Sequence, residues 1–138
     1  MKHATAADIV LDASALIRGM LRESDIAIEV LDRIDDGSTR AHAPDLIDAE
    51  TANALLRLVR GGRLRPEAVA RMLEASTSSP VVRHPSSEFA RPAFELAMDT
   101  GLSAYDSFYA VLSRMLDIPL VTADRKLAAA VDGSVLVT

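Results

Sequence analysis

Four carboxylates are the residues of this chain whose type and placement could do chemistry. Three lie near the end of an expected helix or strand, and the fourth lies on a helix after the second strand. They are Asp12, Glu50, Asp106 and Asp124. Carboxylates that crowd together while ionised need a cation between them. Oxygen ligands without Cys or His favour Mg²⁺ or Mn²⁺, and these ions suit phosphoryl chemistry.

Each of these acids also has an ordinary structural explanation. Asp12 and Asp124 could each cap the helix that follows. Asp106 follows Ser103 at the spacing of a capping box. Glu50 could lie on the solvated face of an amphipathic helix. No one acid is convincing alone, and the argument for a site rests on the set.

Asp106 is the strongest of the four, because its expected helix offers little else that is polar. On a helical wheel, apolar side chains of residues 104–116 point in nearly every direction. They are Tyr105, Phe108, Val111, Leu112, Met115 and Leu116. A carboxylate on a largely buried helix is costly unless it is paired or bound to a metal.

Short apolar strands alternate with helices along the chain. Strands are expected at 8–12, 40–43, 80–83, 118–121 and 135–137. Helices are expected at 13–21, 27–34, 45–60, 66–75, from 86 or 87 to 101, 104–116 and 125–131. This alternation predicts an α/β fold with a short, mostly parallel five-stranded sheet and helices on both faces. Ligands of such sheets bind at the carboxyl ends of the strands.

Turn and cap residues set the expected helix ends. Asp45 is the expected N-cap of the helix over 45–60, with Asp48 at capping-box spacing. Gly61 and Gly62 are expected to end that helix. A serine, Ser86 or Ser87, is expected to cap the fifth helix.

Composition limits the class of protein. The 138 residues suit a single domain, 1–138. There are no cysteines, which excludes thiol catalysis and zinc–thiolate sites. No run is long enough to span a membrane, and a cytoplasmic location is the default expectation. The net charge of -5 argues against broad electrostatic binding to nucleic acid, although metal ions can offset an acidic site.

Four stretches carry a resemblance to a known family. They read IVLDASAL from residue 9, APDLIDAETANAL from 43, LSAYDSFYAVL from 102 and PLVTADRKL from 119. In this order and over this length they resemble the PIN domain, and within it the VapC toxins of bacterial toxin–antitoxin pairs. The resemblance implies that Asp12 and Asp106 are the principal ligands of Mg²⁺ or Mn²⁺, while Glu50 and Asp124 act directly or through water.

The resemblance also implies supporting residues around the acids. Ser14 and Thr122 would support the site by hydrogen bonds. Asn53 shares a helix face with Glu50 and would extend the polar surface. Asp117 departs from the pattern, because these sequences commonly carry Gly in that turn, and it is not carried over as a ligand.

The activity implied is endonucleolytic hydrolysis of RNA, often of a tRNA or ribosomal RNA. Water activated by the metal would attack the phosphorus, and the 3′ oxygen would leave. Such toxins are typically homodimers that a VapB-type antitoxin inhibits, often with an Arg presented to the acids. A PIN nuclease that works in RNA processing without an antitoxin is the nearest alternative.

One basic segment stands out in this acidic chain. It contains Arg57, Arg60, Arg63, Arg65 and Arg71, opposed only by Glu67. It is either a solvated surface or a contact for RNA phosphates, with Arg57, Arg60 and Arg63 nearest to Glu50. The apolar residues of these middle helices could instead serve a dimer or the antitoxin.

Other functions remain open from the sequence. An aspartyl-phosphate receiver or phosphatase would share the small α/β architecture, although Ser14 stands where such a phosphatase needs a second Asp. A metal-independent ribonuclease could use His42 and His84 as acid and base. A non-catalytic protein-binding domain could keep the fold without needing the acids.

Overall fold

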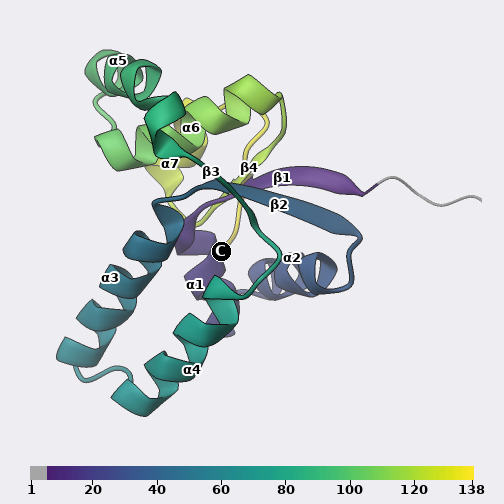
Figure 1. The fold of residues 1–138 in the computed structure, drawn as a ribbon, viewed down its shortest axis with the longest axis vertical. Coiled ribbons are helices and arrows are strands. Elements are labelled where there is room, and N and C mark those ends of the chain that lie inside the picture. Colours follow the sequence, from purple (N-terminus) through teal and green to yellow (C-terminus); the bar gives the residue numbers. More distant parts are fainter. Residues whose placement is uncertain (1–5) are drawn as a thin grey trace, which may run out of the picture.

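Five strands form one parallel sheet in the computed structural model, which describes residues 6–138 (Figure 1). The strands are β1 (Ala7–Leu11), β2 (Thr39–Pro44), β3 (Val82–His84), β4 (Leu120–Thr122) and β5 (Val135–Leu136). Their order is β3-β2-β1-β4-β5, and each of the four strand pairs is parallel. The predicted α/β class is therefore confirmed, with a sheet that is parallel throughout the described residues.

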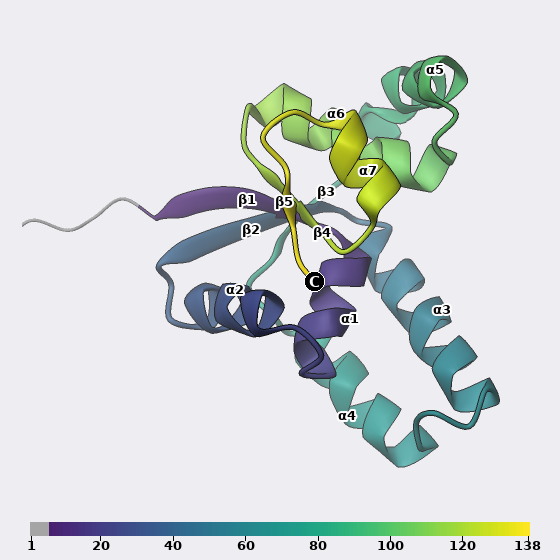
Figure 2. The same cartoon turned by 180° about the vertical axis from the view of Figure 1, so that it is seen from behind.

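Seven α-helices and one 3₁₀ turn connect the strands in the described part of the chain. They are α1 (Ala13–Met20), α2 (Asp25–Asp35), α3 (Ile47–Arg60), α4 (Pro66–Thr77), η1 (Ser86–Glu88), α5 (Ala90–Thr100), α6 (Ala104–Leu116) and α7 (Arg125–Ala130). Helices α5, α6 and α7 lie on one side of the sheet and α1 and α2 on the other (Figures 1 and 2). The α3–α4 hairpin projects away from the sheet. Within residues 6–138 no helix has the length and apolar character of a membrane span.

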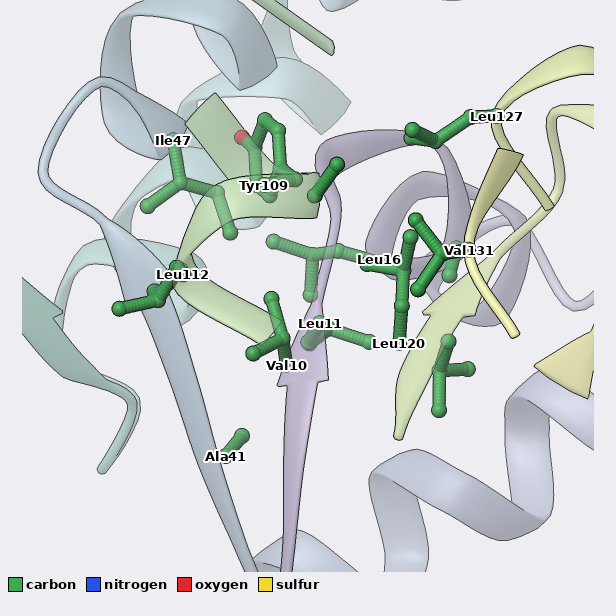
Figure 3. Packing of buried hydrophobic residues seen from close by; sticks show 14 of the residues in the cluster. Val10, Leu11, Leu16, Ala41, Ile47, Tyr109, Leu112, Leu120, Leu127 and Val131 are labelled. Carbon is green, nitrogen blue, oxygen red and sulfur yellow. The ribbon is translucent and has the colours of Figure 1, made fainter. Parts of the chain in front are cut away.

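Strand β1 is the centre of the core. Val10 and Leu11, adjacent in β1, are 0% and 1% exposed, as expected for a parallel sheet covered on both faces. Side chains from other strands and from both helical layers cluster around them, including Leu16, Tyr109 and Leu120 (Figure 3). Strand β1 is thereby held at both of its edges and both of its faces, so its carboxyl end is a fixed platform.

The strand order also excludes one of the sequence alternatives, the aspartyl-phosphate receiver. Receivers of the flavodoxin-like type have the order 2-1-3-4-5, whereas this sheet has β1 between β2 and β4. The receiver alternative is therefore wrong. In this order the direction of chain winding reverses between β1 and β4, which places a crevice at their carboxyl ends.

The start of α3 differs from the prediction. Asp45 does not cap the helix, which begins at Ile47 without a side-chain cap. Asp45 Oδ1 instead accepts hydrogen bonds from the backbone N–H (3.2 Å) and the hydroxyl of Ser86. Asp48 forms a two-point ion pair with Arg83, at 2.8 and 3.0 Å. Arg83 lies in β3 and Ser86 just after it, 35 and 41 residues from their partners, so no local pattern could indicate them.

The third strand and the fifth helix also begin later than predicted. The third strand starts at Val82 instead of residue 80. Because Ser86 is bound to Asp45 and lies in η1, it cannot cap α5, which starts at Ala90 after the N-cap Phe89. Strand β4 begins at Leu120 because Ile118 is still held to α6, where the Ser113 hydroxyl donates to its carbonyl at 2.6 Å.

Helix α6 is buried in its middle and exposed at both ends, so the expectation of a helix covered in nearly every direction holds only for the middle. Tyr105, Met115 and Leu116, near the ends, are 62%, 60% and 37% exposed. The buried residues of the middle point in most directions around the helix axis and are Ser107, Tyr109, Ala110, Val111, Leu112 and Ser113. Asp117 ends the helix in the left-handed region at φ +53°, a conformation that glycine adopts at no steric cost.

Gly19 sets how closely α1 approaches α2. A Cβ atom at this position would lie 2.4 Å from Cδ1 and 2.8 Å from Cγ of Leu31. We predict that Gly19→Ala lowers the free energy of unfolding by about 1–3 kcal/mol through overpacking, although alanine is the better helix former. Urea denaturation of Gly19→Ala, and of Gly19→Ala with Leu31→Ala as the relieving change, measures this. Stability equal to or above wild type in Gly19→Ala would show that the helices are not in contact there.

Candidate active site

Two aspartates, each the N-cap of a helix, lie at the crevice between the carboxyl ends of β1 and β4. Asp12 follows β1 and caps α1, with its Oδ1 accepting from the Ala15 backbone N–H at 3.0 Å. Asp124 follows β4 and caps α7, with its Oδ1 accepting from the Leu127 N–H at 3.0 Å. The capping explanations are thus correct for both residues. Capping uses one oxygen of each carboxylate and does not exclude a second role for the other.

Asp12 is buried and closely held. It is 4% exposed. The Ser14 hydroxyl donates to its Oδ1 at 2.7 Å, and the Thr122 hydroxyl donates to its Oδ2 at 2.6 Å. Each hydroxyl has one proton, so the 3.3 Å approach between Ser14 and Thr122 is a contact of two donors already committed to Asp12.

The same two hydroxyls also fix the loop that carries Asp124. Thr122 Oγ1 accepts from the Asp124 backbone N–H at 3.0 Å, and Ser14 Oγ accepts from the Ala123 N–H at 3.0 Å. Ser14 and Thr122 therefore lie where the resemblance placed supporting residues. Through them, the end of β1 and the end of β4 form one hydrogen-bonded unit.

Asp106 and Glu50 enter the crevice from helices on either side. Asp106 lies in the first turn of α6, where its backbone N–H donates to Ser103 Oγ at 3.1 Å. This is one bond of the two in a capping box, so the carboxylate itself is not needed as a cap. Glu50 lies in the first turn of α3, and its Oε1 is buried without a hydrogen-bond partner within residues 6–138.

The four acids line one cavity of about 160 Å³. Its other lining residues are Ala13, Ser14, Ile17, Ala54, Arg57 and Tyr109. A larger hollow of about 470 Å³ lies at the other end of α6, around Asp117 and Pro119, and it contains none of the four acids. The four acids in its lining, and not its volume, identify the smaller cavity as the candidate site.

Burial and mutual repulsion raise three of the four pKa values. Burial raises the pKa of the Asp12 carboxyl, although hydrogen bonds from Thr122 and Ser14 oppose this. Burial raises the pKa of Glu50, with Asp106 and Asp12 adding to it against the Tyr109 hydroxyl. Burial and the charge of Asp124 raise the pKa of Asp106. The negative charges of the acids repel one another across the cavity, so a positive charge placed among them would be stabilised.

The donor set fits a hard divalent cation, although the side chains do not form a closed site. Carboxylate oxygens without Cys or His are the ligands that Mg²⁺ and Mn²⁺ prefer. Glu50 Oε1 is a buried acceptor without a hydrogen bond of good geometry in the described chain, although the Tyr109 hydroxyl lies near this carboxyl group. In residues 6–138, however, no group of three or more Asp, Glu or His side chains stands close enough together to hold an ion. The carboxylates would have to come closer together to hold an ion.

The other predicted residues are placed less centrally. Asn53 is exposed and lines a neighbouring hollow instead of the acidic cavity. Arg57 lines both. Arg60 and Arg63 are exposed and line neither. The structure thus brings one of the three predicted arginines to the acids.

The two histidines do not support a metal-independent mechanism. His42 Nδ1 and His84 Nε2 lie 3.0 Å apart, and His42 Nε2 lies 2.9 Å from Asp8 Oδ1. This chain of contacts joins β1, β2 and β3. Neither histidine lines the acidic cavity, so both are occupied in a separate structural network.

Tyr109 is a site residue that the sequence reasoning missed. It is 1% exposed, and its hydroxyl is buried at the cavity without a hydrogen bond of good geometry among the described residues. Burial raises its pKa far above the usual range, with Glu50 adding to the effect. A tyrosine three residues after Asp106, in the middle of an apolar helix, was the available signal, because buried tyrosine hydroxyls usually have a hydrogen-bond partner.

The PIN domain family model matches residues 9–133. An α/β sheet with acids gathered at its switch point agrees with that match, and the chain belongs to the PIN domain family. Within the family it is related to VapC ribonucleases. Ribonuclease VapC9 of Mycobacterium tuberculosis is 33% identical over 120 residues, covering 87% of this chain and 88% of the relative.

Solved structures share the fold. PAE2754 from Pyrobaculum aerophilum is 29% identical with a TM-score of 0.70, covering 96% of this chain and 91% of that one. VapBC2 from Rickettsia felis, bound to a DNA fragment from their promoter, is 13% identical with a TM-score of 0.64, covering 94% of this chain and 96% of that one. The second likeness concerns the fold alone.

Two buried threonines provide a matched pair for testing the Asp12 network. Thr122 is 0% exposed and donates to Asp12, whereas Thr51 is 1% exposed and its hydroxyl has no partner in the described residues. We predict that Thr122→Val lowers the free energy of unfolding by about 1–3 kcal/mol, because a buried carboxylate loses its donor. Thr51→Val should be neutral or stabilising. Urea denaturation of both variants decides, and equal effects would contradict the network.

The raised acid pKa values predict how stability depends on pH without metal. An acid whose pKa is higher in the folded than in the unfolded state makes the free energy of unfolding fall as pH rises from about 4 through the folded pKa. In EDTA, Asp106→Asn should be more stable than wild type at about pH 8, with the difference shrinking toward pH 4. Asp99→Asn on the exposed side of α5 is the control for charge alone. A less stable Asp106→Asn at pH 8 would refute repulsion in the cavity.

Proposed function

We propose that this protein is a Mg²⁺- or Mn²⁺-dependent endoribonuclease and the toxin of a toxin–antitoxin pair, acting as one domain. One observation carries the proposal: acids from four separate segments line a single cavity at the sheet's switch point. The relation to ribonuclease VapC9 supports RNA as the substrate class. A tRNA or ribosomal RNA is the expected target.

Each residue has a part in the proposed reaction. Asp12, fixed by Ser14 and Thr122, would be the rigid ligand of the cation. Asp106 would be the second principal ligand, and Glu50 would join with its unsatisfied oxygen. When bound, the cation would supply charge stabilisation at the phosphate and an activated water.

Proton handling and substrate placement would fall to the surrounding side chains. Glu50, with its pKa raised by burial, is suited to hold a proton of the attacking water. Asp124 caps α7 through Oδ1 and lines the cavity, so its other oxygen is not used by the cap. Arg57 at the cavity wall would hold a phosphate of the RNA backbone.

Protein partners belong to the same proposal. A VapB-type antitoxin would inhibit the toxin by placing a basic side chain among the acids, which their mutual repulsion favours. The solved VapBC2 assembly has this fold and supports such a pair. Exposed apolar side chains on α3 and α5, including Leu56, Phe94 and Met98, offer surface for a homodimer or the antitoxin. The alternative without an antitoxin is a PIN nuclease of RNA processing.

RNA cleavage tests the proposed reaction directly. Total RNA incubated with the protein should be cut with Mg²⁺ or Mn²⁺ and left intact in EDTA. Asp106→Asn should lower the cleavage rate by a factor of about 10² or more, because a principal ligand loses its charge. Asp99→Asn, which makes the same change on an exposed surface, should cut like wild type.

The same assay separates the competing functions. Cleavage that persists in EDTA would overturn the metal mechanism. RNA left intact by pure wild-type protein with Mg²⁺ and with Mn²⁺ would favour a non-catalytic binding domain. A neighbouring reading frame whose product binds the protein and stops cleavage would distinguish a toxin from a processing nuclease.

A further inference from the structure

A second hollow lies beside the acidic cavity. Its volume is about 440 Å³, and it is lined by Ala49, Glu50, Asn53, Arg57 and Tyr105. Glu50 and Arg57 also line the acidic cavity, so the two spaces adjoin. The acidic cavity, at about 160 Å³, has room for a phosphate and an ion. The second hollow is in the size range of sites that bind small organic groups.

Tyr105 forms an aromatic wall of this hollow. It is 62% exposed, in the first turn of α6, although the buried middle of the helix begins two residues later at Ser107. A lone exposed aromatic residue needs no explanation in itself. Here, however, the ring is adjacent in sequence to Asp106 and lines a space that continues to the acids. An exposed aromatic face is the surface on which unpaired nucleobases stack.

The remaining lining residues supply the other parts of a nucleotide site. The Asn53 side chain, exposed on α3, carries both a donor and an acceptor that can pair with a base edge. Arg57 takes part in none of the ion pairs found within residues 6–138. Arg57 lines both spaces, so it is within reach of a phosphate that joins a nucleotide in one to a nucleotide in the other. Helices α3 and α6 thus contribute charge, hydrogen bonding and stacking to one hollow.

We propose that this hollow binds the nucleobase next to the phosphate that is cut, with the base stacked on Tyr105, its edge near Asn53 and its phosphate held by Arg57. The proposal rests on the proposed ribonuclease function and adds the residues that select a single-stranded substrate. A base within a duplex is stacked on its neighbours and cannot enter, so the site favours loops and unpaired segments.

The test compares two probes of equal charge in EDTA, so that cleavage plays no part. One is fluorescein-labelled oligoadenylate of twelve nucleotides. The other is a ribose-phosphate twelve-mer in which each base is replaced by hydrogen. Fluorescence anisotropy gives the dissociation constants. Wild type should bind the adenylate roughly tenfold tighter or more, as expected from one stacked base.

Four variants locate that preference. Tyr105→Leu should bind the two probes nearly equally, and Tyr105→Phe should keep the preference because it keeps the ring. Phe94→Leu, which removes an equally exposed ring on α5 (63% exposed), should behave like wild type. Arg57→Gln should weaken the binding of both probes and make that binding less dependent on salt concentration.

Each outcome bears on a different claim. Equal binding of both probes by wild type overturns the base site and leaves the ribonuclease proposal standing. Absence of binding to either probe counts against both. A preference that survives Tyr105→Leu overturns the role of this residue. If Tyr105→Leu instead changes the mass measured by light scattering and leaves the preference intact, the ring belongs to an interface between copies, and the proposal fails.

Discussion

The hydrogen bond from Thr122 to Asp12, 2.6 Å long and fully buried, is the interaction on which the site depends. It joins the carboxyl ends of β1 and β4, which are 110 residues apart in sequence. Without donors, a carboxylate at 4% exposure would be too costly to keep ionised. With them, the carboxylate is held in place at the point where the sheet's winding reverses, although burial still raises its pKa. Ser14 completes the arrangement by binding both Asp12 and the β4 loop.

The position of the Asp12 carboxylate affects the acids on the surrounding helices. Asp106 and Glu50 approach Asp12 from α6 and α3, and burial and repulsion raise their pKa values. A cation or a basic side chain among the acids would relieve this electrostatic repulsion. Under the proposed function, a metal ion and an inhibitory partner would therefore compete for the same acids, because Asp12 is held in place by Ser14 and Thr122.

Much of this could be predicted from the sequence, because the pattern is local. The alternation of apolar strands and helices gave the α/β class, and four short motifs gave the acids that line the cavity. The errors came from contacts between distant segments. Asp45 is hydrogen-bonded to Ser86, and Asp48 is ion-paired with Arg83, because β3 packs beside β2. Tyr105 and Tyr109 lie one turn apart on the same side of α6, yet they are 62% and 1% exposed. Other elements cover the middle of the helix and not its ends, and a helix apolar in most directions does not indicate where that cover stops.

The central claim is that the acids converge to bind a divalent cation. Titration of the RNA-free protein with Mn²⁺, followed by electron paramagnetic resonance of the free ion, measures this without any reaction. Wild type should bind Mn²⁺, Asp12→Asn should bind it at least about tenfold more weakly because the fixed ligand is lost, and Asp99→Asn should match wild type. Binding by Asp12→Asn with unchanged affinity would contradict the account, because the ion would then be held somewhere other than this cavity.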